Sequence, residues 1–338
     1  MNILLTSVGR RTYLINYFKK ALKGEGFIYA SNSVMTYSLS QADRYVLTPQ
    51  IYDEIYIDFL LKYCQRENIR MVISLFDIDL PVLTKNKHRF NDLGIQLIVS
   101  DEAVTAICND KWETYKFLKS IDLNCPKTYK NLESAKGALN TGDLIYPLIV
   151  KPRWGMGSIG IMRADNEEEL DVFYKKIKRE LFSTYLKFES SACPEECVII
   201  QEYIQGQEYG LDVLNDLNGN YVTTIAKKKL AMRAGETDIA QIVRNDQFLN
   251  IATTLSKALK HIANLDVDCF IDNWGHVFVL ELNCRFGGQY PFSHNAGVDF
   301  PKQLILWGEG KSTDMNLLTP KIGVTSCKDL NPVIIEYE

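Results

Sequence analysis

The sequence predicts an α/β protein with a parallel, Rossmann-like sheet near the N-terminus and a mixed α+β arrangement toward the C-terminus. Two observations support this. Over the first hundred residues, short apolar runs alternate with stretches of helical periodicity, and parallel strands need crossover helices of this kind. Toward the C-terminus, two apolar runs flank Asn273-Trp274-Gly275, whose residue types are typical of the turn in an antiparallel hairpin.

The first hundred residues predict four strands and three helices. Strands are expected at 2–7, 27–31, 71–76 and 95–99, and helices at 12–23, 51–67 and 80–93. Gly9 after the first strand is only part of a nucleotide-binding turn, because the full G-x-G-x-x-G pattern is absent. Dinucleotide binding by this sheet is therefore not expected.

The rest of the chain predicts a different mixture of elements. Ser100-Asp101-Glu102 has the residue types of a capped helix start, and helices are expected to follow it up to residue 121. Further strands are expected at 146–154, 159–164, 198–205, 208–214, 221–232, 267–272 and 276–282, and further helices at 167–182 and 248–263. Because 338 residues exceed one ordinary core, we expect two or three domains.

Composition excludes several classes of protein. A formal net charge of −4 with dispersed Lys and Arg residues gives no basic surface for nucleic acid. No apolar run approaches the length of a membrane span, and the N-terminus lacks the charge order of a secretory signal. The eight cysteines are scattered, and the pair Cys193 and Cys197 has no partners that complete a zinc site. We therefore expect a cytoplasmic protein with reduced thiols, and a homodimer only as the general prior.

The stretch VLELNCRFGG, residues 279–288, carries three polar side chains at alternating positions. Successive side chains of a strand point to opposite faces, so Glu281, Asn283 and Arg285 should share one face. Two oxygen donors for a hard cation beside a guanidinium suggest metal and phosphate held side by side. The alternative is the solvated face of an amphipathic edge strand.

The hairpin adds a second carboxylate to this group. Asp268 precedes the predicted turn and Glu281 follows it, so antiparallel pairing would bring the two side chains together. With Asn283 they would form an oxygen cage suited to magnesium on nucleotide phosphates. Asp272 competes as a ligand, but its position at the hairpin end favours a role in the turn. The alternative is a set of unrelated surface acids.

A glycine-rich loop lies between two predicted strands. Gly155, Gly157 and Gly160 allow close backbone approach, so amide N–H groups of the loop, which includes Ser158, can point at phosphate oxygens. Lys151 at the preceding strand end would add a positive charge to the same anion. The loop is not a Walker motif, because no Gly-Lys-Ser/Thr follows. A plain glycine-rich hairpin is the alternative.

Five motifs in order resemble the ATP-grasp superfamily, and in particular the carbamoyl-phosphate synthase large chain and stand-alone carboxylate–amine ligases. The motifs are NDK with Lys111, IVKP with Lys151, the loop 155–160, QEYIQGQEY at 201–209 and VLELNCR at 279–285. This resemblance implies a Rossmann-like pre-ATP-grasp domain at 1–100, a helical linker at 101–125, a small lobe at 126–204, a large lobe at 205–310 and a tail at 311–338.

The resemblance also implies residue roles. Lys111 and Lys151 would contact the nucleotide, with the loop residues Gly155, Gly157 and Ser158 over its phosphates. The adenine-binding hinge would be Glu202, Tyr203 and Ile204, with Glu208 on the ribose; the magnesium ligands would be Asp268, Glu281 and Asn283; and the catalytic residues would be Arg285, Arg233 and Glu236. Asn283-Cys284-Arg285 departs from the family's Asn-Pro-Arg only on the opposite strand face.

Each of these residues also has an ordinary structural interpretation. Lys111 would be an exposed helix lysine, Glu202 and Glu208 surface acids, and Arg233 a loop residue that balances acids. Asp77 and Asp79 follow a strand, where they would contact substrate or cap the next helix, and we favour the cap. His294 lies where an acceptor contact or a hydrogen-bonded loop histidine is equally expected.

The function that the resemblance implies is an ATP-dependent ligase. It would phosphorylate a small-molecule carboxylate to an acyl phosphate and couple it to an amine, releasing ADP and phosphate, with ATP and Mg²⁺ as cofactors and Mn²⁺ as the alternative metal. One rival is phosphorylation of bicarbonate or carbamate, as in carbamoyl-phosphate synthesis. Another is a regulatory protein that binds ATP without turnover, although the intact acidic residues oppose it.

Overall fold

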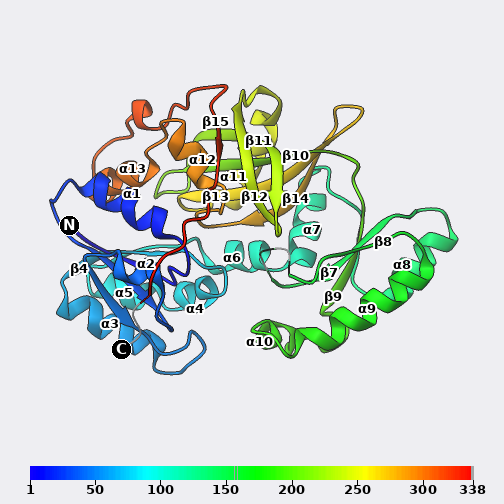
Figure 1. Ribbon diagram of the computed structural model, residues 1–338, viewed down its shortest axis with the longest axis horizontal. Helices are drawn as coiled ribbons and strands as arrows, with labels where there is room; N and C mark the ends of the chain where they lie inside the picture. The colour runs from blue at the N-terminus through cyan, green and yellow to red at the C-terminus, as the bar shows by residue number, and fades with distance from the viewer. Residues whose placement is uncertain (156, 158, 336–338) are drawn as a thin grey trace.

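The computed structural model describes residues 1–155, 157 and 159–335, and three sheets follow one another along the chain (Figure 1). The first sheet has the order β3-β2-β1-β4-β5 and is parallel throughout, which confirms the Rossmann-like prediction. Its strands are β1 (Asn2–Thr6), β2 (Ile28–Asn32), β3 (Arg44–Leu47), β4 (Ile69–Ser74) and β5 (Gln96–Ile98). Its helices are α1 (Thr12–Leu22), α2 (Tyr37–Ser40), α3 (Tyr56–Arg66), α4 (Asp79–Lys85) and α5 (Lys87–Asp92).

The second sheet is antiparallel along its β6-β9-β7-β8 order and follows two connecting helices, α6 (Glu102–Asn109) and α7 (Lys111–Ser120). Its strands are β6 (Thr128–Tyr129), β7 (Leu148–Pro152), β8 (Met162–Ala164) and β9 (Val198–Glu202), with helices α8 (Leu132–Asn140), α9 (Glu167–Leu181) and α10 (Lys187–Ser190). Apolar side chains of β7 and β9 pack against α9 in a core that belongs to this part alone. We name residues 126–204 the small lobe.

The third sheet is antiparallel, with the order β14-β13-β10-β11-β12-β15. Its strands are β10 (Gly206–Asn215), β11 (Tyr221–Arg233), β12 (Glu236–Val243), β13 (Asn264–Asp272), β14 (Val277–Asn283) and β15 (Thr325–Cys327). Helices α11 (Leu249–Leu259), α12 (Tyr290–Asn295) and α13 (Phe300–Gly308) pack around it. The third sheet shares its two cores with the N-terminal sheet, and α13 packs on α1.

The hairpin of β13 and β14 forms as predicted. Asp272 shapes its turn, because Oδ1 accepts hydrogen bonds from the backbone N–H groups of Trp274, at 2.9 Å, and His276, at 2.8 Å. Asp266 lies opposite Asn283 and Asp268 lies opposite Glu281, and the register then shifts before Cys269. This bulge resets the side-chain alternation along β14.

One consequence of the bulge is visible in the burial of β14. Val279, Leu282 and Cys284 all enter the core, whereas Glu281 and Asn283 face away from it into a cavity. Strict alternation would have placed Val279 on the same face as Glu281. The prediction that Glu281, Asn283 and Arg285 share a face is confirmed.

Several elements were not expected from the sequence. β3 is a largely exposed edge strand, α3 begins five residues later than the predicted helix, and β12 pairs with β11 where no strand was predicted. The C-terminal segment returns to the third sheet as β15, which pairs with β12 through Ile239 and Cys327. Within the described residues, no helix combines the length and apolar character needed to cross a membrane.

Candidate active site

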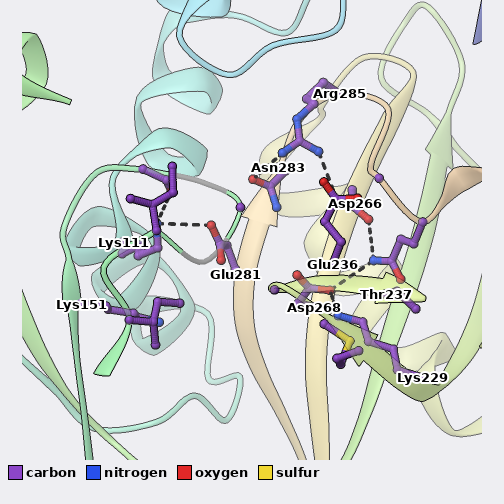
Figure 2. Close-up of a pocket in the computed structure, with 18 of the residues that line it drawn as sticks. Lys111, Lys151, Lys229, Glu236, Thr237, Asp266, Asp268, Glu281, Asn283 and Arg285 are labelled. Atoms are coloured by element: carbon purple, nitrogen blue, oxygen red, sulfur yellow. Dashed lines mark hydrogen bonds and ion pairs between the residues drawn. The ribbon is translucent and has the colours of Figure 1, made fainter. Parts of the chain in front are cut away.

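A cavity of about 220 Å³ lies where the three parts of the chain meet (Figure 2). Its polar lining comes from all three parts: Arg11, Lys111, Lys151, Lys229, Glu236, Thr237, Asp266, Asp268, Glu281, Asn283, Arg285, Gln289 and Lys328. The three predicted metal ligands Asp268, Glu281 and Asn283 all line this cavity, because the hairpin register places them side by side on two paired strands.

The carboxylates of this site are balanced by lysines. Asp268 Oδ1 lies 2.6 Å from the ammonium of Lys229, and Glu281 Oε1 lies 3.3 Å from that of Lys111. Two carboxylates and an amide oxygen on neighbouring strands suit a hard cation whose remaining positions are filled by phosphate oxygens or water. The donor set therefore fits Mg²⁺, although the described residues contain no cluster of three or more Asp, Glu, His or Cys side chains able to hold a metal alone.

Asp266 is a further acid of this site that the sequence reasoning did not single out. Its Oδ1 accepts a hydrogen bond of 2.6 Å from Gln289, and its Oδ2 lies 3.3 Å from Arg285. Burial, together with the nearby negative charge of Asp268, raises the pKa of Asp266 to about 7. The two-residue spacing from Asp268 was a usable signal, since residues i and i+2 of a strand share a face.

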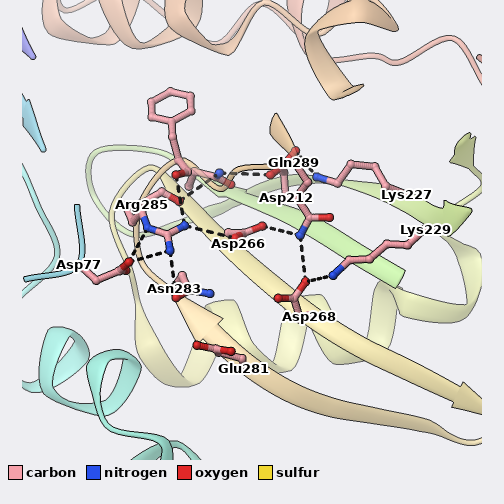
Figure 3. Close-up of polar contacts among 12 residues, drawn as sticks. Asp77, Asp212, Lys227, Lys229, Asp266, Asp268, Glu281, Asn283, Arg285 and Gln289 are labelled. Atoms are coloured by element: carbon pink, nitrogen blue, oxygen red, sulfur yellow. Dashed lines mark hydrogen bonds and ion pairs between the residues drawn. The ribbon is translucent and has the colours of Figure 1, made fainter. Parts of the chain in front are cut away.

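Arg285 is held rigidly at one end of the site (Figure 3). Its Nε and Nη2 both donate to Asp77 Oδ2, at 2.9 and 2.7 Å, and Nη1 donates to Asp266. Burial alone would lower the pKa of Arg285, but the carboxylates of Asp77 and Asp266 outweigh it and raise the pKa. The guanidinium is therefore a permanent positive charge with a fixed orientation.

The predicted helix cap at Asp77 and Asp79 is wrong. Helix α4 begins at Asp79 itself, and its N-cap residue, Ile78, makes no side-chain capping bond. Asp77 instead binds Arg285, and Asp79 is fully buried. Asp79 accepts hydrogen bonds from Thr6, Ser7, Tyr56 and Ser74. Most partners of these two carboxylates come from segments distant in the sequence, so the residues next to Asp77 and Asp79 do not reveal them.

Two lysines enter the cavity from the small-lobe side. Lys151 is 3 % exposed, and its ammonium donates to Gln201 Oε1 at 2.7 Å. Burial lowers the pKa of Lys151 to about 8. Lys111 donates to the carbonyl of Gly155 at 2.6 Å, which ties the start of α7 to the glycine-rich loop.

The loop itself needs glycine at Gly155. Its φ is +130°, and an added Cβ would lie 2.9 Å from the side chain of Leu186. Gly155 and Gly157 both line the cavity, as their predicted role requires. Ser158, also predicted to contact phosphate, lies outside the described residues.

The predicted adenine hinge, Glu202, Tyr203 and Ile204, connects the second sheet to the third, since β9 ends at Glu202 and β10 begins at Gly206. Glu202 Oε2 accepts from the N–H of Lys127 at 3.0 Å, and the guanidinium of Arg163 lies 5.0 Å from the Tyr203 ring centre. These residues lie at the junction of the lobes and do not line the 220 Å³ cavity.

Glu208, the predicted ribose acceptor, is paired with a lysine that the sequence reasoning missed. Lys229 lies 2.6 Å from both Glu208 and Asp268. Burial lowers the pKa of Lys229, but the two carboxylates outweigh it and raise the pKa. Side-chain alternation along a strand predicts that Lys227 and Lys229 share one face and Lys228 the other, but it does not identify the face that carries the acids.

The two predicted catalytic residues near the β11–β12 turn occupy different positions. Glu236 lines the cavity and its Oε2 lies 3.0 Å from the ammonium of Lys328. Arg233 is not part of the lining; it pairs with Asp238 and donates to the carbonyl of Lys328 at 3.1 Å. Lys328 reaches the site because it directly follows β15, which pairs with β12 and has no recognisable strand pattern of its own.

Two other side chains complete the description. Arg11, which the sequence reasoning did not select, lines the cavity from the loop after β1. His294 stacks on Tyr17 with ring centres 3.6 Å apart, and burial lowers its pKa. His294 lies outside the cavity lining, and the hydroxyl of Tyr290 lies 3.4 Å from its Nδ1. It is thus near a hydrogen-bonding partner, but on α12 rather than in a loop, and a contact to an acceptor stays a prediction.

Comparison with known proteins places this geometry in context. The model of a PylC-like N-terminal domain matches residues 3–98, and the model of an ATP-grasp domain matches residues 108–289, which is more than half of the chain. A D-alanine–D-alanine ligase from Thermotoga petrophila is 34% identical over 133 residues. That match spans 39% of this chain and 38% of the relative, so it covers well under two thirds of the relative's length.

Solved structures agree in fold over most of the chain. Biotin carboxylase from Campylobacter jejuni covers 96% of this chain and 74% of its own, with a TM-score of 0.73 and 16% identity. An L-amino acid ligase from Bacillus licheniformis covers 94% and 77%, with a TM-score of 0.69 and 18% identity. The N5-carboxyaminoimidazole synthetase of Staphylococcus aureus, complexed with ADP, covers 93% and 78%, with a TM-score of 0.71 and 17% identity.

The domain match, the order of the three sheets and the fold shared with these enzymes agree with one another. The chain belongs to the ATP-grasp family, with a PylC-like N-terminal domain preceding its ATP-grasp domain.

Proposed function

We propose that the protein is an ATP-dependent ligase that phosphorylates a carboxylate to an acyl phosphate and joins it to an amine, releasing ADP and phosphate. One observation supports this above all others: the acids Asp268 and Glu281 share a cavity with Lys111, Lys151 and Arg285. Such a set of fixed charges suits phosphoryl transfer, which needs positioning and charge neutralisation more than a protein nucleophile.

The chemistry follows from the weakness of a carboxylate as an electrophile. Its negative charge repels a nucleophile, and oxide is a poor leaving group. When the carboxylate oxygen attacks the γ-phosphorus of ATP, the bond from that phosphorus to the β,γ-bridging oxygen breaks and ADP leaves. The amine nitrogen then attacks the carbonyl carbon of the acyl phosphate, phosphate leaves with the bonding electron pair, and the amine loses a proton.

Each charged side chain has a role in this scheme. Lys111 and Lys151 would neutralise the nucleotide phosphates from the small-lobe side, beneath the glycine-rich loop. Arg285, oriented by Asp77, would stabilise the transferring phosphoryl group and then the oxyanion formed by the attacking amine. A Mg²⁺ ion held by Asp268, Glu281 and Asn283 would supply positive charge to the phosphates. The hinge residues 202–204 and Glu208 remain proposed contacts to the nucleoside.

The experiment that tests this function measures the products of ATP. The full-length protein is incubated with ATP, Mg²⁺ and a panel of carboxylates paired with amines, and ADP, phosphate, AMP and pyrophosphate are quantified. ADP and phosphate formation that depends on both substrates supports the proposal. Release of AMP and pyrophosphate contradicts the acyl phosphate route.

Two further outcomes separate the rival functions. ADP formation with bicarbonate alone would indicate phosphorylation of bicarbonate, as in the alternative prediction. Tight ATP binding without turnover across the whole panel would indicate a regulatory protein. The first outcome is read from the product assay, and the second also needs a calorimetric titration of the protein with ATP.

A further inference from the structure

A second, smaller cavity of about 20 Å³ adjoins the active site and shares one wall with it. Its walls come from the loop after β4, the end of α6 and the small-lobe helix α10, and it shares Lys111, Gly155, Glu281 and Asn283 with the larger cavity. The volume admits a group of about the size of one water molecule. A group bound here would therefore be the end of a molecule that extends into the main site.

Three oxygen atoms in residues lining this small cavity lack a hydrogen-bond partner. They are Asp77 Oδ1, Asn109 Oδ1 and Glu189 Oε2, and each is buried without a donor among the described residues. Asp77 is only 7% exposed. Buried acceptors are nearly always paired in folded proteins, so three unpaired ones around one cavity indicate a missing donor group.

In each of these side chains, the second polar atom of the amide or carboxylate makes a hydrogen bond that fixes the orientation of the group. The amide nitrogen of Asn109 donates to the carbonyl of Asp77 at 2.8 Å, which leaves its oxygen as the free acceptor. Oδ2 of Asp77 is engaged by Arg285, and Oε1 of Glu189 accepts from the hydroxyl of Tyr52. The three free oxygens are one amide oxygen and two carboxylate oxygens, so each of them can accept a hydrogen bond from a bound group.

The charge balance around the cavity points to a cation. The carboxylate of Asp77 is offset by Arg285, but Glu189 forms no ion pair with any described residue. Lys111 also lines the cavity, yet its ammonium is engaged by the carbonyl of Gly155 and by Glu281. Apolar side chains of Ile78, Trp154 and Leu186 form the remaining walls, and a low dielectric strengthens the attraction for a cation.

We propose that this small cavity is the subsite for a primary ammonium group of a substrate. An ammonium carries three N–H donors and one positive charge, which match the three free acceptors and the unbalanced carboxylate of Glu189. The described residues offer no group of three or more Asp, Glu, His or Cys that would hold a metal ion here. That the bound ammonium belongs to a substrate rests on the proposed ligase function. The arrangement of the three acceptors does not depend on that function.

The location of Glu189 makes the subsite dependent on the position of the small lobe. Asp77 and Asn109 belong to the N-terminal part and α6, whereas Glu189 lies on α10 of the small lobe. The third acceptor is therefore present only when α10 is docked against the N-terminal part through Tyr52. Binding of an ammonium would favour that docked arrangement, because the bound group contacts both sides.

The test uses simple cations as probes, so that it does not require turnover. Thermal unfolding of the full-length protein is followed in methylammonium chloride and, at the same concentration, in tetramethylammonium chloride, which has the same charge but no N–H donor. We expect methylammonium to raise the unfolding temperature more than tetramethylammonium. We expect this difference to disappear in Glu189→Gln and in Asn109→Leu, and to persist in the control Glu195→Gln, an exposed acid of the same lobe.

Three results would overturn the inference. Equal effects of the two cations on the unmodified protein would show that no N–H donor is recognised. A difference that survives in Glu189→Gln would place the binding elsewhere, and that variant decides the matter even if Asn109→Leu fails to fold. Stabilisation by Mg²⁺ alone that is lost in Glu189→Gln would identify a metal site instead.

A kinetic arm distinguishes the two possible sources of the ammonium, which are the molecule whose carboxylate is activated and the molecule that supplies the attacking amine, where the ammonium would be a second amino group that does not react. With an active substrate pair, the Glu189→Gln variant should raise the KM of one substrate by roughly tenfold or more and leave the other unchanged. The substrate whose KM rises is the one bound here. If no pair yields ADP, the proposed function fails, whereas the cation experiment still decides the subsite.

Discussion

Lys151 is charged in a place where burial disfavours charge. Its side chain is 3% exposed, and burial lowers its pKa to about 8, so a nearby anion is needed to hold the proton at higher pH. A nucleotide phosphate would be such an anion. At the residue scale, the protein thus buries a positive charge at the position where we propose that the nucleotide phosphates bind.

The pKa of Lys151 predicts a pH dependence of ATP binding. Because the pKa lies below its ordinary value, the ammonium is present below pH 8 and lost above it. Affinity for a non-hydrolysable ATP analogue should therefore fall roughly tenfold between pH 7 and pH 9. Calorimetric titration would measure this. Lys151→Met should bind more weakly with a flatter profile, whereas Lys116→Met, on an exposed helix face, should keep the slope.

A second prediction at this scale concerns Glu281, a proposed metal ligand. Replacing its carboxylate by an amide in Glu281→Gln keeps the shape and removes the charge. Turnover should fall at least about 100-fold, while the unfolding temperature stays close to that of the unmodified protein. The matched control is Asp272→Asn, which retains the oxygen that shapes the hairpin turn. Near-normal turnover in Glu281→Gln would contradict the assignment of the metal ligands.

At the scale of single elements, the sequence predicted the strands that carry a clear apolar pattern. β1, β4 and β7 bury most of their residues, and the turn residues between β13 and β14 signal a hairpin directly. β3, β12 and β15 escaped prediction because they are short or carry polar residues. β15 spans only Thr325–Cys327 and is fixed by its pairing with β12 rather than by its own sequence.

The residues of the candidate site were likewise predictable where a local sequence pattern brings them together. Glu281, Asn283 and Arg285 were predictable because alternation on one strand brings them together, and Asp268 because the hairpin turn lies between. Lys229 and Lys328 could not be assigned in the same way. Lys229 reaches Asp268 because β10, the neighbour of β11, pairs with the distant strand β13, and Lys328 reaches the site because β15 pairs with β12. The cap expected at Asp77 and Asp79 failed for the same reason.

β15 gives a prediction for the C-terminal segment. Lys328 reaches the cavity from this strand and contacts Glu236, so Lys328→Met should lower kcat/KM by roughly tenfold through weaker positioning of Glu236. Steady-state kinetics would measure this effect. Lys321→Met, an exposed lysine earlier in the same segment, should leave kcat/KM unchanged. Equal losses in both variants would argue against a role for Lys328.

The link between α11 and β13 predicts an acid sensitivity. His261 is fully buried, its Nε2 lies 3.1 Å from the carbonyl of Val213, and burial lowers its pKa to about 4. The unfolded chain binds a proton near pH 6.5 while the folded chain does not, so stability is lost as pH falls from 6.5 to 4.

The loss from this one group should be about 3 kcal/mol. Urea unfolding at pH 7 and pH 4.5 would measure it. His261→Gln, which cannot take up the proton, should be less stable at pH 7 but lose less on acidification. An unchanged difference between the two pH values in this variant would rule out His261 as the source.

On the scale of the whole molecule, the small lobe is the part whose packing is separate from the rest. It has its own core, whereas the N-terminal and third sheets share two cores. Its tip touches the N-terminal part through Tyr52 and Phe188, with ring centres 4.5 Å apart, and through Phe76 and Tyr185, at 6.4 Å. These contacts lie at α10 and the residues just before it, whereas the chain leaves the lobe for the third sheet after β9 (Figure 1).

This arrangement predicts the effect of loosening the tip. Tyr52→Ala removes the ring contact with Phe188 and the hydrogen bond to Glu189, so α10 should spend more time undocked. Hydrogen exchange of the amides in α10 should accelerate several-fold, and ATP analogues should dissociate faster. The matched control is Tyr45→Ala, which removes an exposed tyrosine from β3, the strand before Tyr52. This change should alter neither rate.

Arg285 and the acid that orients it, Asp77, are 208 residues apart in the chain and follow strands of different sheets, β14 and β4. Recombining this chain with a relative at the boundary near residue 100 would therefore separate the proposed catalytic arginine from its support. Chimeras that keep the tip of β4 and the end of β14 from the same parent should retain activity, whereas those that mix parents at these two points should fold and yet work poorly. For protein engineering, the segments that follow β4 and β14 should therefore be exchanged together.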